Sequence, residues 1–284
     1  NLTRIARTDS NLLPKDYDLK QGSCLPVSPV LSTISGSSRY FSSENTLSNS
    51  WDITTPTFQH FIPLANGYPY TQTLFTPDHT NRIRVQSGMG EFHRMGSGHE
   101  TYTYYGVPSQ NELDALFGNN VGFSKHYSKT MVVDPNGQVS LSYTDLKGRV
   151  IATALSGDSL GNLDTIQGFA EGQRIHVEDA LQSVTMSTDG TTAYSTYTFL
   201  VDQNNTVNQF HYGIKSDTMN SCVQLCHDCV YDLTINLIDG CGNEIFRYTS
   251  TIGDSSGCTL DTSSFDTSVV LNSGSYTIFK TLSI

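Results

Sequence analysis

Residues 134–155 read DPNGQVSLSYTDLKGRVIATAL, and this stretch carries the strongest fold signal in the chain. Apolar residues alternate with serine from Val139 to Tyr143, which is the pattern of a half-buried strand. Just before that run, Asn136-Gly137 tolerates the positive φ of a type I′ hairpin turn. A second strand is expected from Arg149 to Leu155, after a polar turn. The stretch therefore predicts antiparallel strands joined by tight turns.

The composition of the chain favours the same kind of structure. Its 284 residues include 34 Ser, 33 Thr and 23 Gly, and only 15% of all residues are charged. Such a mixture suits sheets and turns, so we expect no all-α fold. The formal net charge of −11 argues against nucleic acids and anionic membranes as partners, because both are bound through clustered Lys and Arg. No stretch approaches the roughly 18–20 consecutive apolar residues of a membrane span.

Changes in sequence texture divide the chain into three predicted parts. Residues 1–50 are rich in Ser and Asn and predict an irregular N-terminal arm; residues 51–183 predict a sheet region; residues 184–284 predict a β-sandwich that contains cysteines. The sandwich is expected because six strand-like runs follow one another at regular spacing. They are residues 193–201, 207–213, 230–238, 244–250, 267–271 and 275–282.

One short helix is expected inside the sheet region. Ser109 and Glu112 have the spacing of a capping box, and Gly118 follows the apolar stripe as a C-terminal stop. The fold class predicted from the sequence is therefore all-β: an antiparallel sheet region with one short helix, followed by a sandwich.

A Tyr-x-Asp-x-x-Gly-Arg motif lies at the centre of the quoted stretch. Its aspartate can close an Asx-turn, its glycine can take the left-handed conformation, and its arginine can pair with the aspartate or an aromatic ring. A degenerate copy earlier in the chain has asparagine at the left-handed position. The motif residues are Tyr143, Asp145, Gly148 and Arg149, and those of the copy are Asp78, Asn81 and Arg82.

The motif and its surroundings resemble the YD repeats of the Rhs family, and long secreted bacterial Rhs-repeat proteins in particular. The resemblance covers residues 40–160 most densely, including Gly96-Ser-Gly-His-Glu-Thr101, and returns around Cys226 and Asp239. It implies an Rhs-like sheet that is largely non-enzymatic, because repeats in relatives form a shell around an effector. The run Leu271–Ile278 also resembles the last hairpin of prealbumin-like or Cna-B-like sandwiches.

Five of the six cysteines cluster near the C-terminus, and Cys24 stands alone. Disulfides fit a chain that is poor in Lys and rich in Ser and Thr, as exported chains are, but the sequence does not fix the pairing. A structural zinc site is one alternative, since two of the cysteines have the spacing C-x-x-C, although no second such pair follows. Free buried thiols are the other alternative. The disulfide candidates are Cys222, Cys226, Cys229, Cys241 and Cys258.

Histidines and tyrosines in the sheet region raise alternatives to a structural role. His93, His99 and Glu100, joined by His79 or Asp78, could surround a metal ion, but their spacing fits no single helical or strand face. A hydrolase is therefore the third interpretation. Sugar rings could stack on tyrosines of the run Tyr102–Tyr105, although alternating tyrosines are also typical of a half-buried strand.

The sequence predicts a non-enzymatic structural segment of an exported bacterial Rhs-repeat protein that acts as a surface or toxin-delivery scaffold. We expect no catalytic residues, no cofactor and no metal. Its partner would be the remainder of a longer Rhs-type chain or another protein, and its location secreted or on the cell surface. The main alternative is an adhesion module that binds carbohydrate or protein, in which case a glycan would be a partner.

Overall fold

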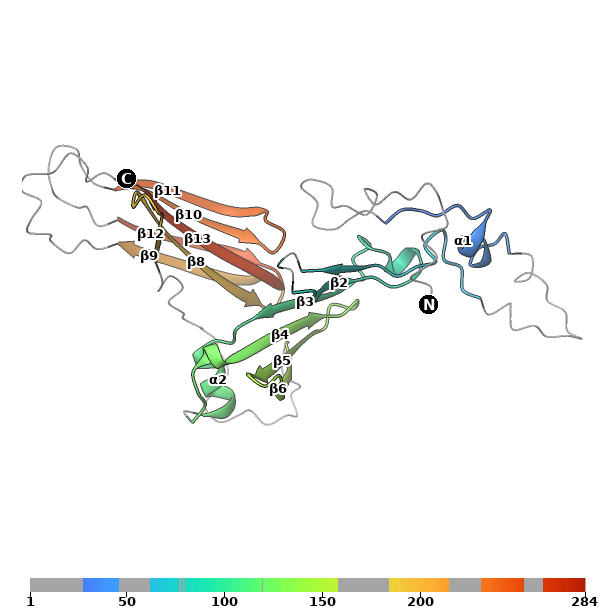
Figure 1. Ribbon diagram of the computed structural model, residues 1–284, viewed down its shortest axis with the longest axis horizontal. Coiled ribbons are helices and arrows are strands. Elements are labelled where there is room, and N and C mark those ends of the chain that lie inside the picture. Colours follow the sequence, from blue (N-terminus) through green and yellow to red (C-terminus); the bar gives the residue numbers. More distant parts are fainter. Residues whose placement is uncertain are drawn as a thin grey trace, which may run out of the picture. The chain divides into compact units, whose positions relative to one another are not determined.

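The computed structural model describes residues 28–45, 62–76, 78, 80–118, 120–157, 184–214, 231–252 and 263–283. Nearly half of these residues lie in strands and few lie in helices, which confirms the predicted all-β class (Figure 1). The described helices are α1 (Gly36–Tyr40) and α2 (Gln110–Phe117), with two 3-10 turns, η4 (Glu91–His93) and η5 (Ser124–His126). Helix α1 lies in the segment that was expected to be irregular, so the described part holds one helix more than the sequence predicted.

The first sheet has six strands that follow one another in chain order. Its strands are β1 (Thr73–Phe75), β2 (Ile83–Gln86), β3 (Thr101–Gly106), β4 (Tyr127–Val133), β5 (Val139–Asp145) and β6 (Val150–Leu155). Strand β5 alternates between buried and half-buried positions from Val139 to Tyr143, because its serines and its apolar residues point to opposite faces. The stretch quoted from the sequence therefore forms β5, β6 and the turns on either side of β5.

The turn between β4 and β5 differs from the predicted type I′. Gly137 has a positive φ of 82°, but Asn136 is not among the residues of positive φ, which a type I′ turn requires at both central positions. Instead, the Gly137 N–H donates to the Asp134 carbonyl at 2.9 Å, and the Asp134 N–H donates to the Gln138 carbonyl at 3.0 Å. Pro135 explains the change, because its ring holds φ near −65°, the value for the first central residue of a type I turn.

Contacts divide the chain into two units, and the division crosses β3, β4 and β5. One unit runs to residue 103 and includes 132–140; the other contains 104–131 and the residues from 141 onward. In the first unit, Val85 of β2 and Met95 are fully buried, and Ala65 is 1% exposed. A backbone hydrogen bond of 2.8 Å from Leu31 to Gly67 holds the segment before α1 in this unit.

Helix α2 in the second unit begins with the predicted capping box. The Ser109 hydroxyl accepts from the Glu112 N–H at 3.1 Å, and the Glu112 carboxylate accepts from the Ser109 N–H at 3.3 Å. Gly118 ends the helix with a positive φ of 72°, and Leu113 is the fully buried residue of the apolar stripe. The sequence signals at both ends of this helix are therefore confirmed.

The C-terminal part of the second unit is a sandwich of two antiparallel sheets. One sheet has the strand order β11-β10-β13-β8-β7, and the other pairs β12 with β9. Consecutive strands alternate between the sheets from β8 to β10 and again from β11 to β13. The strands are β7 (Thr185–Met186), β8 (Thr192–Val201), β9 (Thr206–Ile214), β10 (Tyr231–Asp239), β11 (Glu244–Ile252), β12 (Ser263–Leu271) and β13 (Gly274–Ser283).

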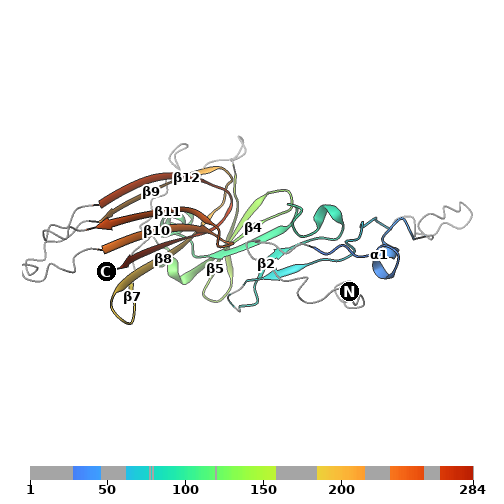
Figure 2. The ribbon, with the colours of Figure 1, turned by 90° about the horizontal axis from the view of Figure 1, so that it is seen from above.

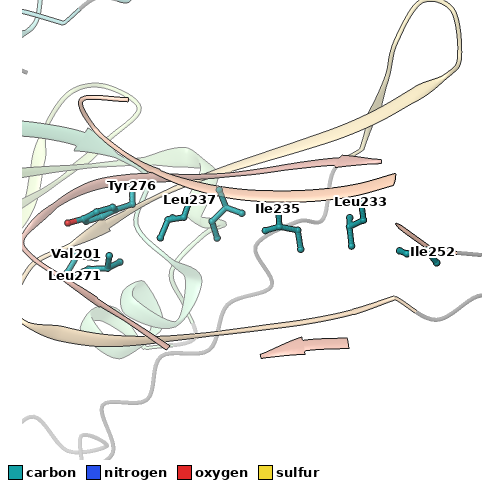
Figure 3. Close-up of a cluster of buried hydrophobic side chains, with 8 residues drawn as sticks. Val201, Leu233, Ile235, Leu237, Ile252, Leu271 and Tyr276 are labelled. Carbon is teal, nitrogen blue, oxygen red and sulfur yellow. The ribbon is translucent and has the colours of Figure 1, made fainter. Parts of the chain in front are cut away.

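The two layers enclose one hydrophobic core. Figure 2 shows β9 and β12 as a layer apart from β11, β10 and β8. Leu233, Ile235 and Leu237 project from β10 into the core, where Val201, Leu271 and Tyr276 also lie (Figure 3). Rings of the two sheets meet there, for example Tyr248 and Phe265, which stack with centroids 4.3 Å apart. The sandwich therefore joins its sheets through large aromatic contacts.

Candidate functional site

The Tyr-x-Asp-x-x-Gly-Arg motif forms the turn between β5 and β6. Asp145 Oδ1 accepts from the N–H groups of Lys147 at 2.9 Å and Arg149 at 3.0 Å. Its Oδ2 accepts from Arg149 Nε at 2.8 Å and lies 2.6 Å from Nη2 of the same residue. Gly148 has φ 75°, and its N–H donates to the Asp145 carbonyl at 2.9 Å. The carboxylate therefore holds the turn by backbone and side-chain contacts together.

Two further turns use the same closure. Asp134 Oδ1 accepts from the N–H groups two and four residues later, at 2.8 and 2.9 Å, and Asp239 Oδ1 does so at the same two distances. The residue three positions after each aspartate is a glycine with φ 82° or 83°. Asn243 even donates a side-chain hydrogen bond of 2.9 Å to Asp239 Oδ2, as Arg149 does to Asp145. The sequence pattern that these three turns share is therefore Asp-x-x-Gly, and the arginine is not part of it.

The degenerate copy between β1 and β2 keeps part of this arrangement. Arg82 pairs with Asp78 at 2.6 Å, and Asn81 takes the left-handed conformation with φ 56°. The backbone closes differently, however, because the Thr76 N–H donates to the Arg82 carbonyl at 2.8 Å. Asp78 Oδ1 also accepts from the hydroxyls of Thr76 and Thr80 at 2.5 and 2.6 Å. The copy is therefore a wider turn centred on the same ion pair.

Hydrogen bonds lower the pKa of both aspartates. The pKa of Asp78 falls well below its ordinary value because the Thr76 hydroxyl, then the Thr80 hydroxyl and then Arg82 donate to its charged form. The pKa of Asp145 is lowered chiefly by the side-chain hydrogen bond from Arg149, followed by the backbone N–H of the same residue. Both carboxyl groups therefore keep their negative charge to a lower pH than a free aspartate does.

Tyr143, the tyrosine of the motif, belongs to a buried polar cluster that we call the Glu112 cluster: Glu112 of α2, Lys129 of β4 and Tyr143 of β5. The Tyr143 hydroxyl donates to Glu112 Oε1, and Lys129 Nζ lies 2.6 Å from the same oxygen. Tyr143 is 2% exposed and Lys129 is 8% exposed. Because Glu112 also completes the capping box, one carboxylate fastens the helix start to two neighbouring strands.

The environment keeps Tyr143 protonated. Burial raises the pKa of its hydroxyl well above the ordinary value, and the hydrogen bond to Glu112 and the charge of that carboxylate act in the same direction. The hydroxyl therefore remains a donor to Glu112 up to a higher pH than a free tyrosine hydroxyl would.

The histidines that suggested a metal site have other contacts. His99 Nδ1 donates to the Pro135 carbonyl at 3.1 Å, and the His99 ring meets that of His93 edge-on at 5.9 Å. Glu100 is 1% exposed, and its carboxylate accepts from the N–H groups of Gly96, Ser97 and Gly98. Among the described residues, no group of three His, Cys, Asp or Glu side chains is placed to hold a metal ion. His79 lies outside the described part of the chain.

The remaining candidate residues are the tyrosine run and the cysteines. The run Tyr102–Tyr105 lies in β3, where all residues are half-buried. Cys241 lies in the turn between β10 and β11, whereas the other disulfide candidates, Cys222, Cys226, Cys229 and Cys258, lie outside the described residues together with Cys24. The pairing of the cysteines therefore stays a prediction. In the described part of the chain, no helix is both apolar enough and long enough to cross a membrane.

Sequence reasoning missed two features of the site. The closures at Asp134 and Asp239 carry the Asp-x-x-Gly signal but lack the arginine that drew attention to the other copies. The Glu112 cluster has no local signal, because its members are 17 and 31 residues apart in sequence.

Comparisons with known proteins add no relative: no protein-family model, no curated protein and no solved structure matches this chain.

Proposed function

We propose that this chain is a non-enzymatic structural segment of an exported bacterial protein of the Rhs-repeat type, a scaffold for a surface or for toxin delivery. One observation carries the proposal. The same hairpin closure occurs at Asp134, Asp145 and Asp239, and in each case the carboxylate binds two backbone N–H groups of its own turn. The repeated aspartates thus reverse the chain, which is the task of a scaffold built from hairpins.

The Glu112 cluster supports the same function. Its lysine, glutamate and tyrosine bind one another and link α2 to two strands, so their polar groups are used in fastening elements. The proposed partner is the remainder of a longer Rhs-type chain or another protein, and the proposed location is outside the cell.

Protease accessibility on intact cells tests this function. Antibodies against the 284-residue chain are used to follow it in the bacterium that encodes it, before and after proteinase K is added to intact cells. We expect the chain to be digested on intact cells or to be present in the culture medium. A chain that is digested only after lysis would contradict the proposal.

An adhesion module for carbohydrate is the second candidate, and a specific surface favours it. Phe92 is 77% exposed, and its ring lies 6.4 Å from that of His99, which also meets His93. Exposed rings of this kind can stack on the apolar face of a sugar. A glycan array probed with the wild-type chain, Phe92→Ala, Tyr104→Ala and the control Phe123→Ala decides the matter. Binding that is lost only in the first or second variant would support the module.

A further inference from the structure

A lysine faces the interior of the sandwich. Lys280 of β13 lies between Ile235 of β10 and Ser195 of β8, its register partners on either side. Ile235 and Ser195 are both 4% exposed, and Ile278, two positions before Lys280 on the same face, belongs to the core. The Lys280 ammonium lies 4.9 Å from the centre of the Tyr212 ring, which comes from β9 in the opposite sheet. The charge therefore sits between the two layers.

This ammonium has no acidic partner among the described residues. Among the described residues, the ion pairs join Arg82, Lys129, Arg149, His211 and Arg247 to carboxylates, and none includes Lys280. The absence is notable in a chain with 27 acidic residues against 16 basic ones. Contact with a ring face compensates only part of the loss of water around a charge.

Two hydroxyl groups near the lysine also have no hydrogen-bond partner in the described part of the chain. Ser195 Oγ and Tyr212 Oη are buried, and no described residue forms a hydrogen bond with either. Both residues lie on the inner faces of their strands, since Ser195 shares the parity of Val201 and Tyr212 that of Phe210, which packs on the core. One ammonium and two hydroxyls, none with an acidic or hydrogen-bonding partner among the described residues, thus lie on the inner faces of the two sheets, and the ammonium contacts the Tyr212 ring.

We propose that Lys280, Ser195 and Tyr212 form a binding site for a small organic monocarboxylate between the two sheets. The ammonium supplies the positive charge, and each hydroxyl can donate to a carboxylate oxygen. A monoanion fits because one cation is present and the net charge of −11 disfavours a dianion. Lys280 is half-buried rather than fully buried, so a ligand can reach it from solvent.

Titration of the full chain with acetate tests the site. Amide resonances of the ¹⁵N-labelled protein are followed by NMR at constant ionic strength, with acetamide as the neutral probe of the same shape. We expect saturable shifts at Ser195, Tyr212 and Lys280 with acetate but not with acetamide. Equal shifts with acetamide, or with chloride in place of acetate, would overturn the proposal.

Variants separate the site from general charge effects. Lys280→Met keeps the apolar stem and removes the ammonium, so acetate affinity should fall by about tenfold or more, as for loss of a charge-assisted hydrogen bond. Tyr212→Phe keeps the ring under Lys280 and removes only the hydroxyl, which keeps the test valid if Lys280→Met does not fold. The control Lys125→Met removes another lysine that lies over a ring, that of Phe123. Unchanged affinity for acetate in both Lys280→Met and Tyr212→Phe would contradict the proposed site.

Discussion

At the residue scale, the turn after β5 depends on the backbone conformation of Gly148. Its φ is 75°, and a Cβ atom added there would meet no atom within 4 Å. Alanine at this position therefore introduces no steric clash. It loses stability only because an alanine must take the left-handed conformation, which costs about 1–2 kcal/mol of free energy. We expect Gly148→Ala to lower the free energy of unfolding by that amount in urea denaturation.

A matched glycine controls for the loss of flexibility. Gly213 of β9 has no positive φ, and an added Cβ would make only ordinary contact, 3.9 Å from His211 Nε2. Gly213→Ala should leave the free energy of unfolding unchanged or raise it slightly. If both variants lose equal stability, the left-handed conformation is not the cause.

The raised pKa of the Tyr143 hydroxyl makes the free energy of unfolding fall at alkaline pH. Folding raises the pKa of this hydroxyl above its ordinary value of 10.0, so at higher pH the unfolded chain releases the proton while the folded chain keeps it. The contribution of this pKa shift to the free energy of unfolding is complete below about pH 10. Above that pH the free energy of unfolding falls by about 1.4 kcal/mol per pH unit. Tyr143→Phe should remove this slope from urea unfolding measured between about pH 9 and pH 11. An unchanged slope would contradict the assignment.

At the scale of elements, Glu112 joins the capping of α2 to the strands beside it. Ser109→Ala removes only the cap and should cost about 1 kcal/mol of unfolding free energy. Glu112→Gln keeps a side chain that can cap but leaves the buried Lys129 ammonium without its counter-charge, so it should cost more, about 3–5 kcal/mol. The control is Ser124→Ala, because the Ser124 hydroxyl has no hydrogen bond to any described residue, while its backbone N–H donates to Gln110 Oε1 and its carbonyl accepts from the Tyr127 N–H. If Glu112→Gln loses no more unfolding free energy than Ser109→Ala, then Glu112 acts only as a helix cap.

Local signals predict the elements well because their causes are local. Helix α2 was predicted from a cap and a stop within ten residues of each other, and both are present. The strands of the sandwich fall within a few residues of their predicted bounds, since alternation and turn residues mark their ends. The prediction of a type I′ turn between β4 and β5 is wrong, because Pro135 fixes the φ of the position before Asn136 and Gly137 at a value that suits a type I turn.

At the scale of the whole molecule, strand pairings between segments that are distant in the sequence cannot be predicted from local sequence signals. Strand β13 lies between β8 and β10, so its register is set by segments that are far from it in the sequence. The residues beside Lys280 in the sheet, Ile235 and Ser195, follow from that register and not from its neighbours in sequence. The role of Tyr143 is similar, since Glu112 lies 31 residues away. The motif residues around Asp145 were accessible to prediction because the turn they close is five residues long.

The cysteines bear on how the two layers of the sandwich stay together. Four links connect sheet β9–β12 to the larger sheet, and two of them, from β9 to β10 and from β11 to β12, contain four of the predicted disulfide cysteines. Cross-links there would shorten the loops of the unfolded chain and stabilise the sandwich by about 2–4 kcal/mol each. We expect mass spectrometry of the unreduced protein to show at least two disulfides. Reduction should then speed hydrogen exchange in β9–β12 while leaving that of α2 and β4–β6 unchanged. If all six cysteines react with an alkylating reagent before reduction, both the cross-links and the argument for export that rests on them fail.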